Sequence, residues 1–421
     1  MNNNKLITRR LFLQRGAVAA GGLAASPLLI SKAAGQTPAN ERIVMGAIGV
    51  GGRGRYILST FLQYPDVQMV AVCDAQGDRR RQAARMVNER YGNEDCASYI
   101  DMRELLARPD IDAVMIATGD NNHSLASIYA ARAGKDIFCE KPLSVTIAES
   151  RAVADTVKRF SRIFQCGTQR RNVSNFVFAA DLARSGLLGR IKTVYAEKAW
   201  PQSGVHYKVL EPQPEPDRER LAWDNWLGAA SWRPYNSEYL GGFWRRHGDF
   251  SGGSITEWGS HTVDMCQWAL GADDTSPVSY ELINDMGDVE ATYADGVKLV
   301  IKTGLRFGSC PVRFEGEEGW VETGDSGEIE THPASLLSDR QFSGGYPADN
   351  HVREFLNCVK SRQQPRSTAE AAHRSISACH CANIAVRLKR AVKWDPVKES
   401  FVDDEEANRL RSRAFREPWM I

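Results

Sequence analysis

The sequence predicts a mixed α/β protein in which a doubly wound parallel sheet is followed by an α+β domain with a large, mostly antiparallel open sheet. Apolar runs alternate with helical stretches in the first third of the chain, as in parallel strands joined by helical crossovers. Beyond about residue 167 apolar and polar residues alternate in short stretches, as in antiparallel strands. A chain of 421 residues has room for both domains.

Residues 1–35 are expected to form a leader. The stretch TRRLFL (8–13) resembles the twin-arginine (Tat) signal of proteins exported in the folded state, and an apolar run (17–30) and small residues (31–35) follow it. We expect a Tat signal peptide and a periplasmic or secreted protein; a disordered basic tail is the alternative. The apolar run is too short and too rich in Gly and Ala to span a bilayer, so we expect no membrane anchor. The net charge of +1 suggests no nucleic-acid partner.

Residues 40–165 are expected to form the parallel-sheet domain. Strands buried on both faces read as continuous apolar runs, and such runs occur at 43–48, 67–73, 113–117 and 136–139. Helical stretches separate them at 55–62, 78–91 and 123–133. Residues 166–421 are expected to form the substrate-binding and oligomerisation domain, with a C-terminal segment that packs back on the first domain.

A glycine-rich turn follows the first strand and has the G-x-G-x-x-G spacing of a Rossmann dinucleotide site. Glycines there permit a tight turn and a close approach of the backbone to a pyrophosphate, which the N-terminus of the next helix then binds. Asp74 ends the second strand, twenty residues after the last glycine, where a carboxylate binds ribose hydroxyls and repels a 2′-phosphate. We therefore predict NAD, with NADP as the alternative because arginines are near. The coenzyme-binding residues predicted here are Gly49, Gly51, Gly52, Arg53, Gly54 and Asp74.

Two further strand ends meet the same edge of the predicted sheet. The loop ATGDNNH (117–123) follows one strand, so Thr118 and His123 are predicted to contact the coenzyme, although His123 equally suits a role in capping the next helix. The sequence CEKPL (139–143) follows the next strand and places Glu140 and Lys141 on this edge.

With these motifs the chain resembles the Gfo/Idh/MocA oxidoreductases, which include glucose–fructose oxidoreductase and inositol dehydrogenase, and in particular their exported bacterial branch. Further matching motifs are GTQRR (167–171), WDNWLG (223–228), WRPYN (232–236) and WDP (394–396). The resemblance covers nearly everything after residue 40. It implies that Lys141 lies beside the nicotinamide and the substrate hydroxyl, where an ammonium polarises oxygen and relays a proton. Glu140 is expected to orient Lys141, and Gln169 to contact the coenzyme.

The predicted partner of Lys141 is the segment 252–264, in which Glu257 and His261 are four residues apart and share a helix face. Asp264, three residues further on, is expected to orient the imidazole as a general base. The family pattern is usually Asp-x-x-x-His. Glu257 stands where the family usually has the aspartate, and this difference puts the identity of the substrate in doubt. Two alternatives are that Glu257 and His261 bind a metal ion together, and that His261 has a structural role in the core. No third metal ligand is evident, so we predict no metal.

A sugar or polyol is the expected substrate, because tryptophans crowd the region before this segment and aromatic faces stack on sugar rings; such tryptophans equally build cores or interfaces. Arg170, Trp244, Arg245 and Asp264 are the predicted substrate-binding residues. The resemblance also implies a homodimer or homotetramer formed through the open sheet.

Three functions fit these observations. The first is an exported NAD(P)-dependent oxidoreductase that acts on a sugar or polyol hydroxyl and recycles a tightly bound coenzyme in place. The second is a redox-neutral NAD-dependent glycosidase or lyase that oxidises the sugar transiently. The third is a sugar-binding protein without catalysis, against which the presence of both Lys141 and His261 argues.

Overall fold

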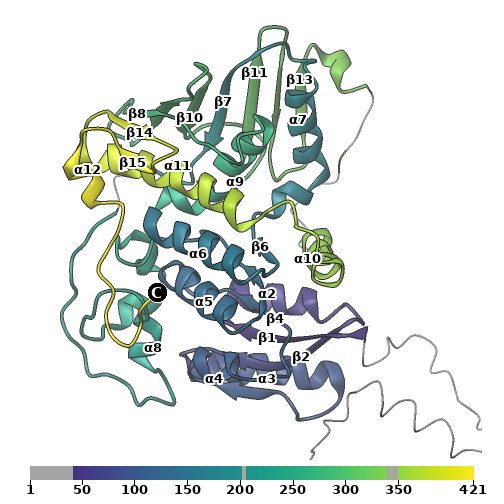
Figure 1. Ribbon diagram of the computed structural model, residues 1–421, viewed down its shortest axis with the longest axis vertical. Coiled ribbons are helices and arrows are strands. Elements are labelled where there is room, and N and C mark those ends of the chain that lie inside the picture. The colour runs from purple at the N-terminus through teal and green to yellow at the C-terminus, as the bar shows by residue number, and fades with distance from the viewer. Residues whose placement is uncertain (1–40, 202–204, 339–341, 343–348) are drawn as a thin grey trace, which may run out of the picture. The chain divides into compact units, whose positions relative to one another are not determined.

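The structure confirms the predicted parallel sheet, whose strands run in the order β3-β2-β1-β4-β5-β6 with parallel neighbours throughout (Figure 1). The computed structural model describes residues 41–201, 205–338, 342 and 349–421, so the expected signal peptide over 1–35 lies outside the described residues. The strands are β1 (Ile43–Ile48), β2 (Val67–Cys73), β3 (Ala97–Tyr99), β4 (Ala113–Ile116), β5 (Asp136–Cys139) and β6 (Phe164–Cys166). The chain order reverses between β1 and β4, which is where such sheets bind ligands.

Helices connect these strands. They are α2 (Gly52–Phe61), α3 (Gly77–Tyr91), α4 (Met102–Leu106), α5 (Asp120–Arg132) and α6 (Ile147–Arg159). Both α2 and α5 begin three residues earlier than the sequence predicts. Their N-terminal turns are made of glycine and polar residues that carry no apolar pattern; in α5 these polar residues are nevertheless buried.

The second sheet has nine strands in the order β13-β12-β11-β7-β10-β9-β8-β14-β15, and only the β7–β10 pair is parallel among the described strands. The mostly antiparallel open sheet is therefore confirmed. Its strands are β7 (Ile191–Glu197), β8 (Ser279–Leu282), β9 (Val289–Thr292), β10 (Lys298–Lys302), β11 (Val312–Gly316), β12 (Trp320–Thr323), β13 (Ile329–His332), β14 (Val392–Asp395) and β15 (Ser400–Phe401).

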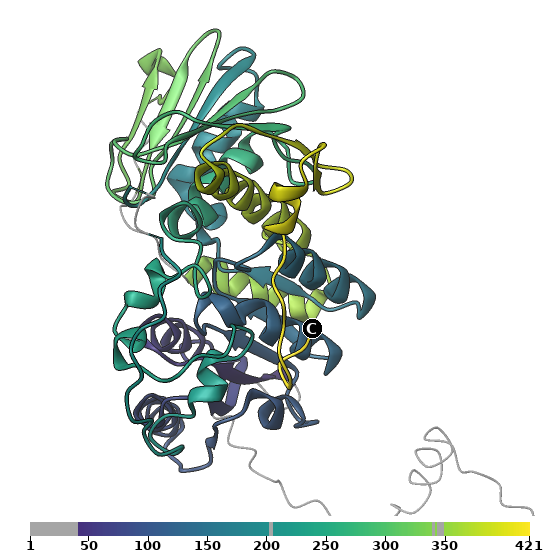
Figure 2. The same cartoon turned by 90° about the vertical axis from the view of Figure 1, so that its left-hand side faces the viewer.

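Three helices cover one face of this sheet, namely α7 (Ser174–Arg184), α9 (Ser254–Ala269) and α11 (Ala369–Leu388) (Figures 1 and 2). Val194, Leu299 and Phe314 point towards these helices and are fully buried. Alternate residues on the other face carry charge. Arg313 pairs there with Glu315 at 2.6 Å and with Glu322 at 3.0 Å.

The two sheets share a continuous apolar core, because α11 packs on α6 of the first domain. The later helix α10 (Asp349–Ser361) also returns to the first domain and buries Val352, Phe355 and Leu356 against α2 and β1. No helix in the described ranges is long and apolar enough to cross a membrane. All nine cysteines carry free thiols.

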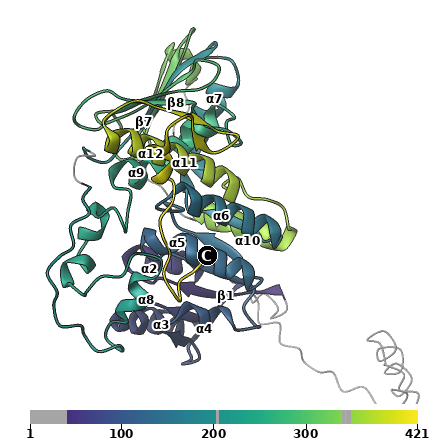
Figure 3. The ribbon, with the colours of Figure 1, turned by 60° about the vertical axis from the view of Figure 1, so that its left-hand side comes forward.

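A long segment between β7 and α9 lies along the first domain (Figure 3). It contains α8 (Trp223–Leu227) and the short 3-10 helices η4 (Ser237–Leu240) and η5 (Phe243–Arg246), and has its own small aromatic core. Trp223 stacks on Trp226 with ring centroids 4.8 Å apart. We call residues 221–250 the aromatic segment.

Candidate active site

The glycine turn after β1 is built so tightly that two of its glycines admit no side chain. Gly49 has a φ of +80°, and a Cβ there would lie 2.4 Å from the backbone nitrogen of Thr118. A Cβ on Gly54 would lie 2.1 Å from the carbonyl oxygen of Gly49. Gly52, in contrast, faces open space. The turn therefore lies close to β4 and leaves its outer side free for a ligand at the N-terminus of α2.

A cavity of about 420 Å³ opens on this turn. The predicted residues that line it are Gly49, Gly51, Gly52, Arg53, Gly54, Asp74, Thr118, Trp244 and Arg245. The aromatic segment closes the other side with Asn225, Trp226 and Leu240. A long cleft with a glycine turn at its base and an acidic residue at one end fits a dinucleotide.

Asp74 lies at that end, with its carboxylate turned towards the glycine turn. Its Oδ2 accepts a hydrogen bond from the Val50 N–H at 2.8 Å, and its Oδ1 accepts one from the Gln76 N–H at 2.9 Å. Each oxygen keeps a second lone pair for a ribose hydroxyl. Burial raises the pKa of Asp74, while Arg79 opposes the rise. The arrangement fits NAD.

Lys141 lies just beyond β5, and its ammonium reaches α9. Lys141 Nζ donates to the backbone carbonyl oxygen of Glu257 at 2.9 Å and contacts Glu257 Oε1 at 3.3 Å. The Nε of Arg245, which also lines the cavity, lies 3.6 Å from the same carboxylate oxygen. Lys141 and Glu257 do not themselves line the cavity. Arg245 therefore connects the cavity to the Lys141–Glu257 pair.

The sequence interpretation overlooked a second carboxyl group in this cluster, that of Asp120 at the start of α5. Burial raises the pKa of Asp120 to about 8, and the charge of Glu257 adds to the rise, while Lys141 lowers it. Its Oδ2 has no hydrogen-bond partner in the described part of the chain. Burial also opposes ionisation of Glu257, but Lys141 and Arg245 outweigh burial and lower its pKa. At neutral pH Glu257 is therefore ionised and Asp120 protonated.

His261 follows Glu257 by one turn of α9 and is buried. Burial lowers its pKa well below the usual value, and the positive charges of Arg170 and Lys141 lower it further. The imidazole is therefore neutral. Its Nδ1 lacks a hydrogen-bond partner among the described residues, so it offers a polar atom to a bound molecule.

The prediction that Asp264 orients His261 is wrong. Asp264 forms a two-point ion pair with Arg171, in which Nε–Oδ2 is 2.7 Å and Nη2–Oδ1 is 2.8 Å, and accepts a hydrogen bond from Ser375 at 2.9 Å. Residues three apart on a helix point about 60° apart, and on α9 this turns Asp264 towards the buried guanidinium. A buried cation requires such a partner. Asp264 therefore neutralises Arg171 inside the fold and has a structural role.

Glu140 also has a different partner from the one predicted. Its Oε1 accepts a hydrogen bond from Arg53 Nε at 2.9 Å, so the carboxylate holds the glycine turn. Gln169 lies beside the same guanidinium, 3.1 Å from Arg53 Nη2. Arg53, Glu140 and Gln169 thus form one polar group at the base of the cleft.

His123 lies in the first turn of α5, whose N-cap is Gly119, so it does not cap the helix. Its Nδ1 lies 2.7 Å from the carbonyl oxygen of Pro142, which places it under the turn that carries Lys141 and away from the cavity wall. Arg170 is likewise held, with its Nε 3.0 Å from Asp325 Oδ1 on the loop after β12. The structure thus brings together Lys141, Glu257 and Arg245, and leaves Asp264 outside that group.

The tryptophans divide between the two roles that the sequence left open. Trp223 belongs to the core of the aromatic segment, and Trp232 is exposed. Trp226 and Trp244 line the cavity, as does Trp419 near the C-terminus, which the sequence did not indicate. No cluster of three or more metal-ligating side chains occurs in the described residues.

Comparisons with known proteins agree with this geometry. Residues 43–168 match the model of the oxidoreductase family NAD-binding Rossmann fold (Gfo/Idh/MocA), and residues 179–421 match that of the family's C-terminal alpha/beta domain. Myo-inositol 2-dehydrogenase of Thermotoga maritima is 32% identical over 379 residues, which are 84% of this chain and 99% of that protein. A glycosyl hydrolase family 109 protein of Saccharopolyspora erythraea is 31% identical over 205 residues, 44% of each chain. The levoglucosan dehydrogenase complex with NADH superposes with a TM-score of 0.61 at 19% identity over 84% of this chain and 99% of that one.

Proposed function

The chain belongs to the Gfo/Idh/MocA oxidoreductase family, and from that premise we propose that it transfers a hydride between NAD and a hydroxyl-bearing carbon of a sugar or polyol. The observation that carries the proposal is the contact of Lys141 with Glu257 beside Arg245, which lines the coenzyme cavity. The similarity to a myo-inositol dehydrogenase over nearly its whole length supports a polyhydroxylated substrate.

Bound NAD supplies the hydride acceptor for the carbon atom. The residues of this chain would remove the proton of the substrate hydroxyl. Lys141 Nζ passes one of its own protons to the ionised carboxylate of Glu257 and accepts the hydroxyl proton in its place, as the C–O single bond becomes a carbonyl. Neutral His261 positions the substrate through its unpartnered Nδ1. Asp120, already protonated, does not compete for this proton.

A direct test is to load the protein with NAD and add candidate polyols and sugars, beginning with myo-inositol, while recording the absorbance of reduced nicotinamide. The proposal expects bound NADH to form with a polyol. Lys141→Ala should greatly slow its formation while the protein still binds NADH. If no polyol or sugar reduces NAD, the proposal is wrong.

A redox-neutral glycosidase or lyase is the second candidate. Two observations favour it, namely the partial match to glycosyl hydrolase family 109 and the presence of a protonated carboxyl beside an ionised one. Oxidation of a sugar carbon acidifies the adjacent C–H, so Glu257 would remove that proton and Asp120 would protonate the departing glycosidic oxygen. A lyase would keep the resulting double bond and a glycosidase would add water across it, and return of the hydride would close either cycle. Turnover of a nitrophenyl glycoside that requires NAD but no acceptor would favour this candidate over net oxidation.

We further propose that the enzyme is exported in the folded state with its coenzyme bound and that each turnover regenerates the coenzyme in place. The twin-arginine motif at 8–13 supports export. Outside the cytoplasm a released coenzyme would not be replaced, so a second substrate must reoxidise it. A Lys-Lys replacement of the arginine pair should abolish export in a bacterial host, and a normal periplasmic yield from that variant would contradict the proposal.

A homodimer or homotetramer formed through the open face of the nine-stranded sheet completes the proposal. That face carries part-buried Trp320 under the Arg313 guanidinium, 3.9 Å from the ring centroid, within a field of ion pairs. Such mixed surfaces suit subunit contacts. Light scattering should give two or four times the mass of one chain; a monomer at micromolar concentration would contradict this expectation.

A further inference from the structure

The last twelve residues leave the second domain and run back along the first, ending beside α5 and α8 (Figures 1 and 3). Figure 2 shows the same path from the side. This C-terminal strap, residues 410–421, follows α12 (Glu405–Arg409) and contains no helix or strand of its own. Its position is therefore set by side-chain and backbone contacts along its length.

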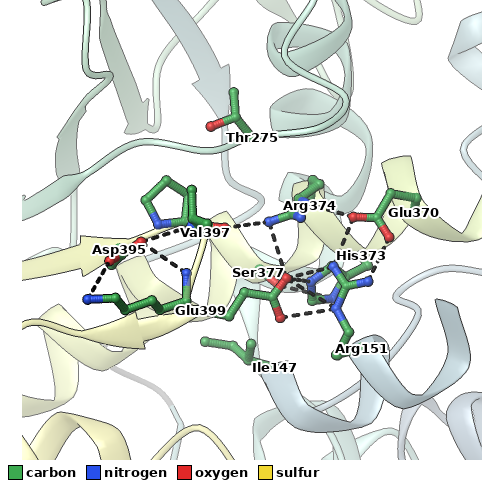
Figure 4. A network of polar contacts seen from close by, with 12 residues as sticks. Ile147, Arg151, Thr275, Glu370, His373, Arg374, Ser377, Asp395, Val397 and Glu399 are labelled. Carbon is green, nitrogen blue, oxygen red and sulfur yellow. Dashed lines mark hydrogen bonds and ion pairs between the residues drawn. The ribbon is translucent and has the colours of Figure 1, made fainter. Parts of the chain in front are cut away.

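The base of the strap is fixed to a part-buried polar network that joins α6, α11 and the β14–β15 turn (Figure 4). In this network Arg151 pairs with Glu370 at 2.7 Å and with Glu399 at 2.6 Å, and His373 Nε2 lies 3.0 Å from Glu399. Arg411 of the strap donates to the Glu399 carbonyl oxygen. These contacts thus hold the start of the strap against the second domain.

Arg413 fixes the middle of the strap to both sides of the cleft. Its guanidinium pairs with the buried Glu149 of α6 at 2.6 Å and donates to the carbonyl oxygen of Asn121 at 3.1 Å. Its Nη1 donates to the carbonyl oxygen of Asp249 in the aromatic segment at 2.7 Å. One side chain therefore connects α5 and α6 with the aromatic segment.

The end of the strap repeats this connection next to the cavity. Arg416 pairs with Asp224 at 2.6 Å and donates to the carbonyl oxygen of Ala230 at 3.0 Å. Trp419 Nε1 donates to Asp224 Oδ2 at 2.9 Å. On the side of the first domain, the Arg103 guanidinium lies 4.4 Å from the Trp419 ring centroid, and Tyr129 donates to the Met420 carbonyl oxygen at 2.9 Å.

Trp419 is also part of the cavity wall. It is 1% exposed and lines the cavity near Ile100 and Met102, which follow the strand next to the one that Asp74 ends. Since an acidic residue in the place of Asp74 binds the adenosine ribose, this apolar end of the cavity faces the adenine. The aromatic segment that Trp419 and Arg416 hold in place supplies Asn225 and Trp226 to the same wall.

We propose that the C-terminal strap is a latch that retains the coenzyme, with Trp419 as a coenzyme-binding residue and Arg416 as a positioning residue that holds the aromatic segment closed. NAD leaves only when the strap detaches and the aromatic segment swings away. The inference rests on the proposed function only in that NAD occupies this cavity, and it gives the proposed in-place recycling a structural basis.

The test is the rate at which bound NADH dissociates, measured by its fluorescence after dilution into excess NAD, in the full-length mature chain. Arg416→Ala and Trp419→Ala should each release NADH at least about tenfold faster than the wild type, because weakened contacts mainly affect dissociation. Trp419→Phe keeps an apolar wall but lacks the hydrogen bond to Asp224, so its rate should lie between those of the wild type and Trp419→Ala. Trp419→Phe also tests the role of Trp419 if the Trp419→Ala variant does not fold.

Matched controls are Arg409→Ala, an exposed arginine in α12, and Trp232→Ala, an exposed tryptophan of the aromatic segment. Both should release NADH at the wild-type rate. If Arg416→Ala and Trp419→Phe bind NADH and release it at the wild-type rate, the proposal that the strap retains the coenzyme is wrong. A wild type that releases NADH within seconds would instead contradict the proposed recycling in place, whichever way the variants behaved.

Discussion

The ammonium of Lys141 lies 2.9 Å from the carbonyl oxygen of Glu257 and 3.3 Å from its carboxylate, so a residue from the parallel-sheet domain and one from α9 meet at a single point. A substrate oxygen that binds Lys141 competes with Glu257 for its donors. The same contact therefore orients the ammonium before substrate arrives and places a proton acceptor next to it afterwards.

Replacing Lys141 tests its part in the chemistry. Lys141→Ala should lower the rate of hydride transfer by roughly 10²- to 10⁴-fold, the usual contribution of a positioned acid or base, while the dissociation constant for NADH changes little. Stopped-flow absorbance gives the rate, and fluorescence titration gives NADH binding. Lys393→Ala, at an exposed position on β14, is the control. Equal hydride-transfer rates in Lys141→Ala and wild type would remove Lys141 from the mechanism.

Asp120 should make the fold less stable as the pH rises. Its folded-state pKa is raised to about 8, so the unfolded chain loses this proton near pH 4 and the folded chain keeps it. Between pH 4 and 8 the free energy of unfolding should therefore fall by up to about 1.4 kcal/mol per pH unit from this group. The charged groups that set this pKa are Glu257, Lys141 and Arg245.

Asp120→Asn removes the titrating group, so its stability relative to the wild type should increase from pH 5 to pH 8. Urea unfolding of both coenzyme-free proteins at several pH values measures the difference. Asp101→Asn removes a carboxyl whose pKa is lowered by Arg103 against the effect of burial, so this group is ionised in the folded and the unfolded chain above pH 5, and its difference from the wild type should stay constant over the same range. A constant difference between Asp120→Asn and wild type would show that Asp120 is ionised in the folded state.

The predictable parts of this molecule are those in which neighbouring residues act together. The glycine turn and Asp74 form one local unit, which is why the residues predicted there line one cavity. Asp120 belongs to a loop that the sequence interpretation assigned to the coenzyme, and its burial and its interaction with the charge of Glu257 have no signature in the sequence. Trp419 reaches the cavity from the last residues of the chain through contacts with α4 and α8.

The error over Asp264 shows the same limit. Helical spacing places Asp264 close to His261. It does not reveal that Arg171, a buried residue of η2 (Gln169–Asn172), forms an ion pair with the Asp264 carboxylate. Arg171 precedes it by 93 residues, and its burial arises only when η2 packs against α9. Polar partners across the fold are therefore the part that sequence spacing cannot supply.

Asp264→Asn should consequently affect stability and leave the chemistry intact. Removing one partner of a buried ion pair costs up to about 3–5 kcal/mol, and the loss here should fall below that limit because Arg171 keeps its pair with Asp273 at 2.7 Å. Thermal and urea unfolding measure the loss. The folded fraction, counted by bound NADH, should retain the wild-type rate constant for hydride transfer. A large fall in that rate constant with little loss of stability would return Asp264 to the catalytic group.

Asp74 should set the preference for NAD over NADP. Asp74→Ala removes the carboxylate that a 2′-phosphate would meet and leaves Arg79 in the cavity wall. The ratio of the dissociation constants for NADPH and NADH should therefore fall by at least about tenfold, which corresponds to 1.4 kcal/mol. Fluorescence titration with each coenzyme measures this ratio. An unchanged ratio would show that residues other than Asp74 determine the preference for NAD over NADP.

The most direct test of the whole account is a spectrum of the purified mature protein, recorded without added coenzyme, as a polyol and then an oxidised sugar are added. The account predicts that nicotinamide coenzyme remains bound through purification, that the polyol converts it to NADH, and that the second sugar reverses the change with no coenzyme free in solution. Protein that purifies without coenzyme and reduces only a freely exchanging NAD pool would contradict it.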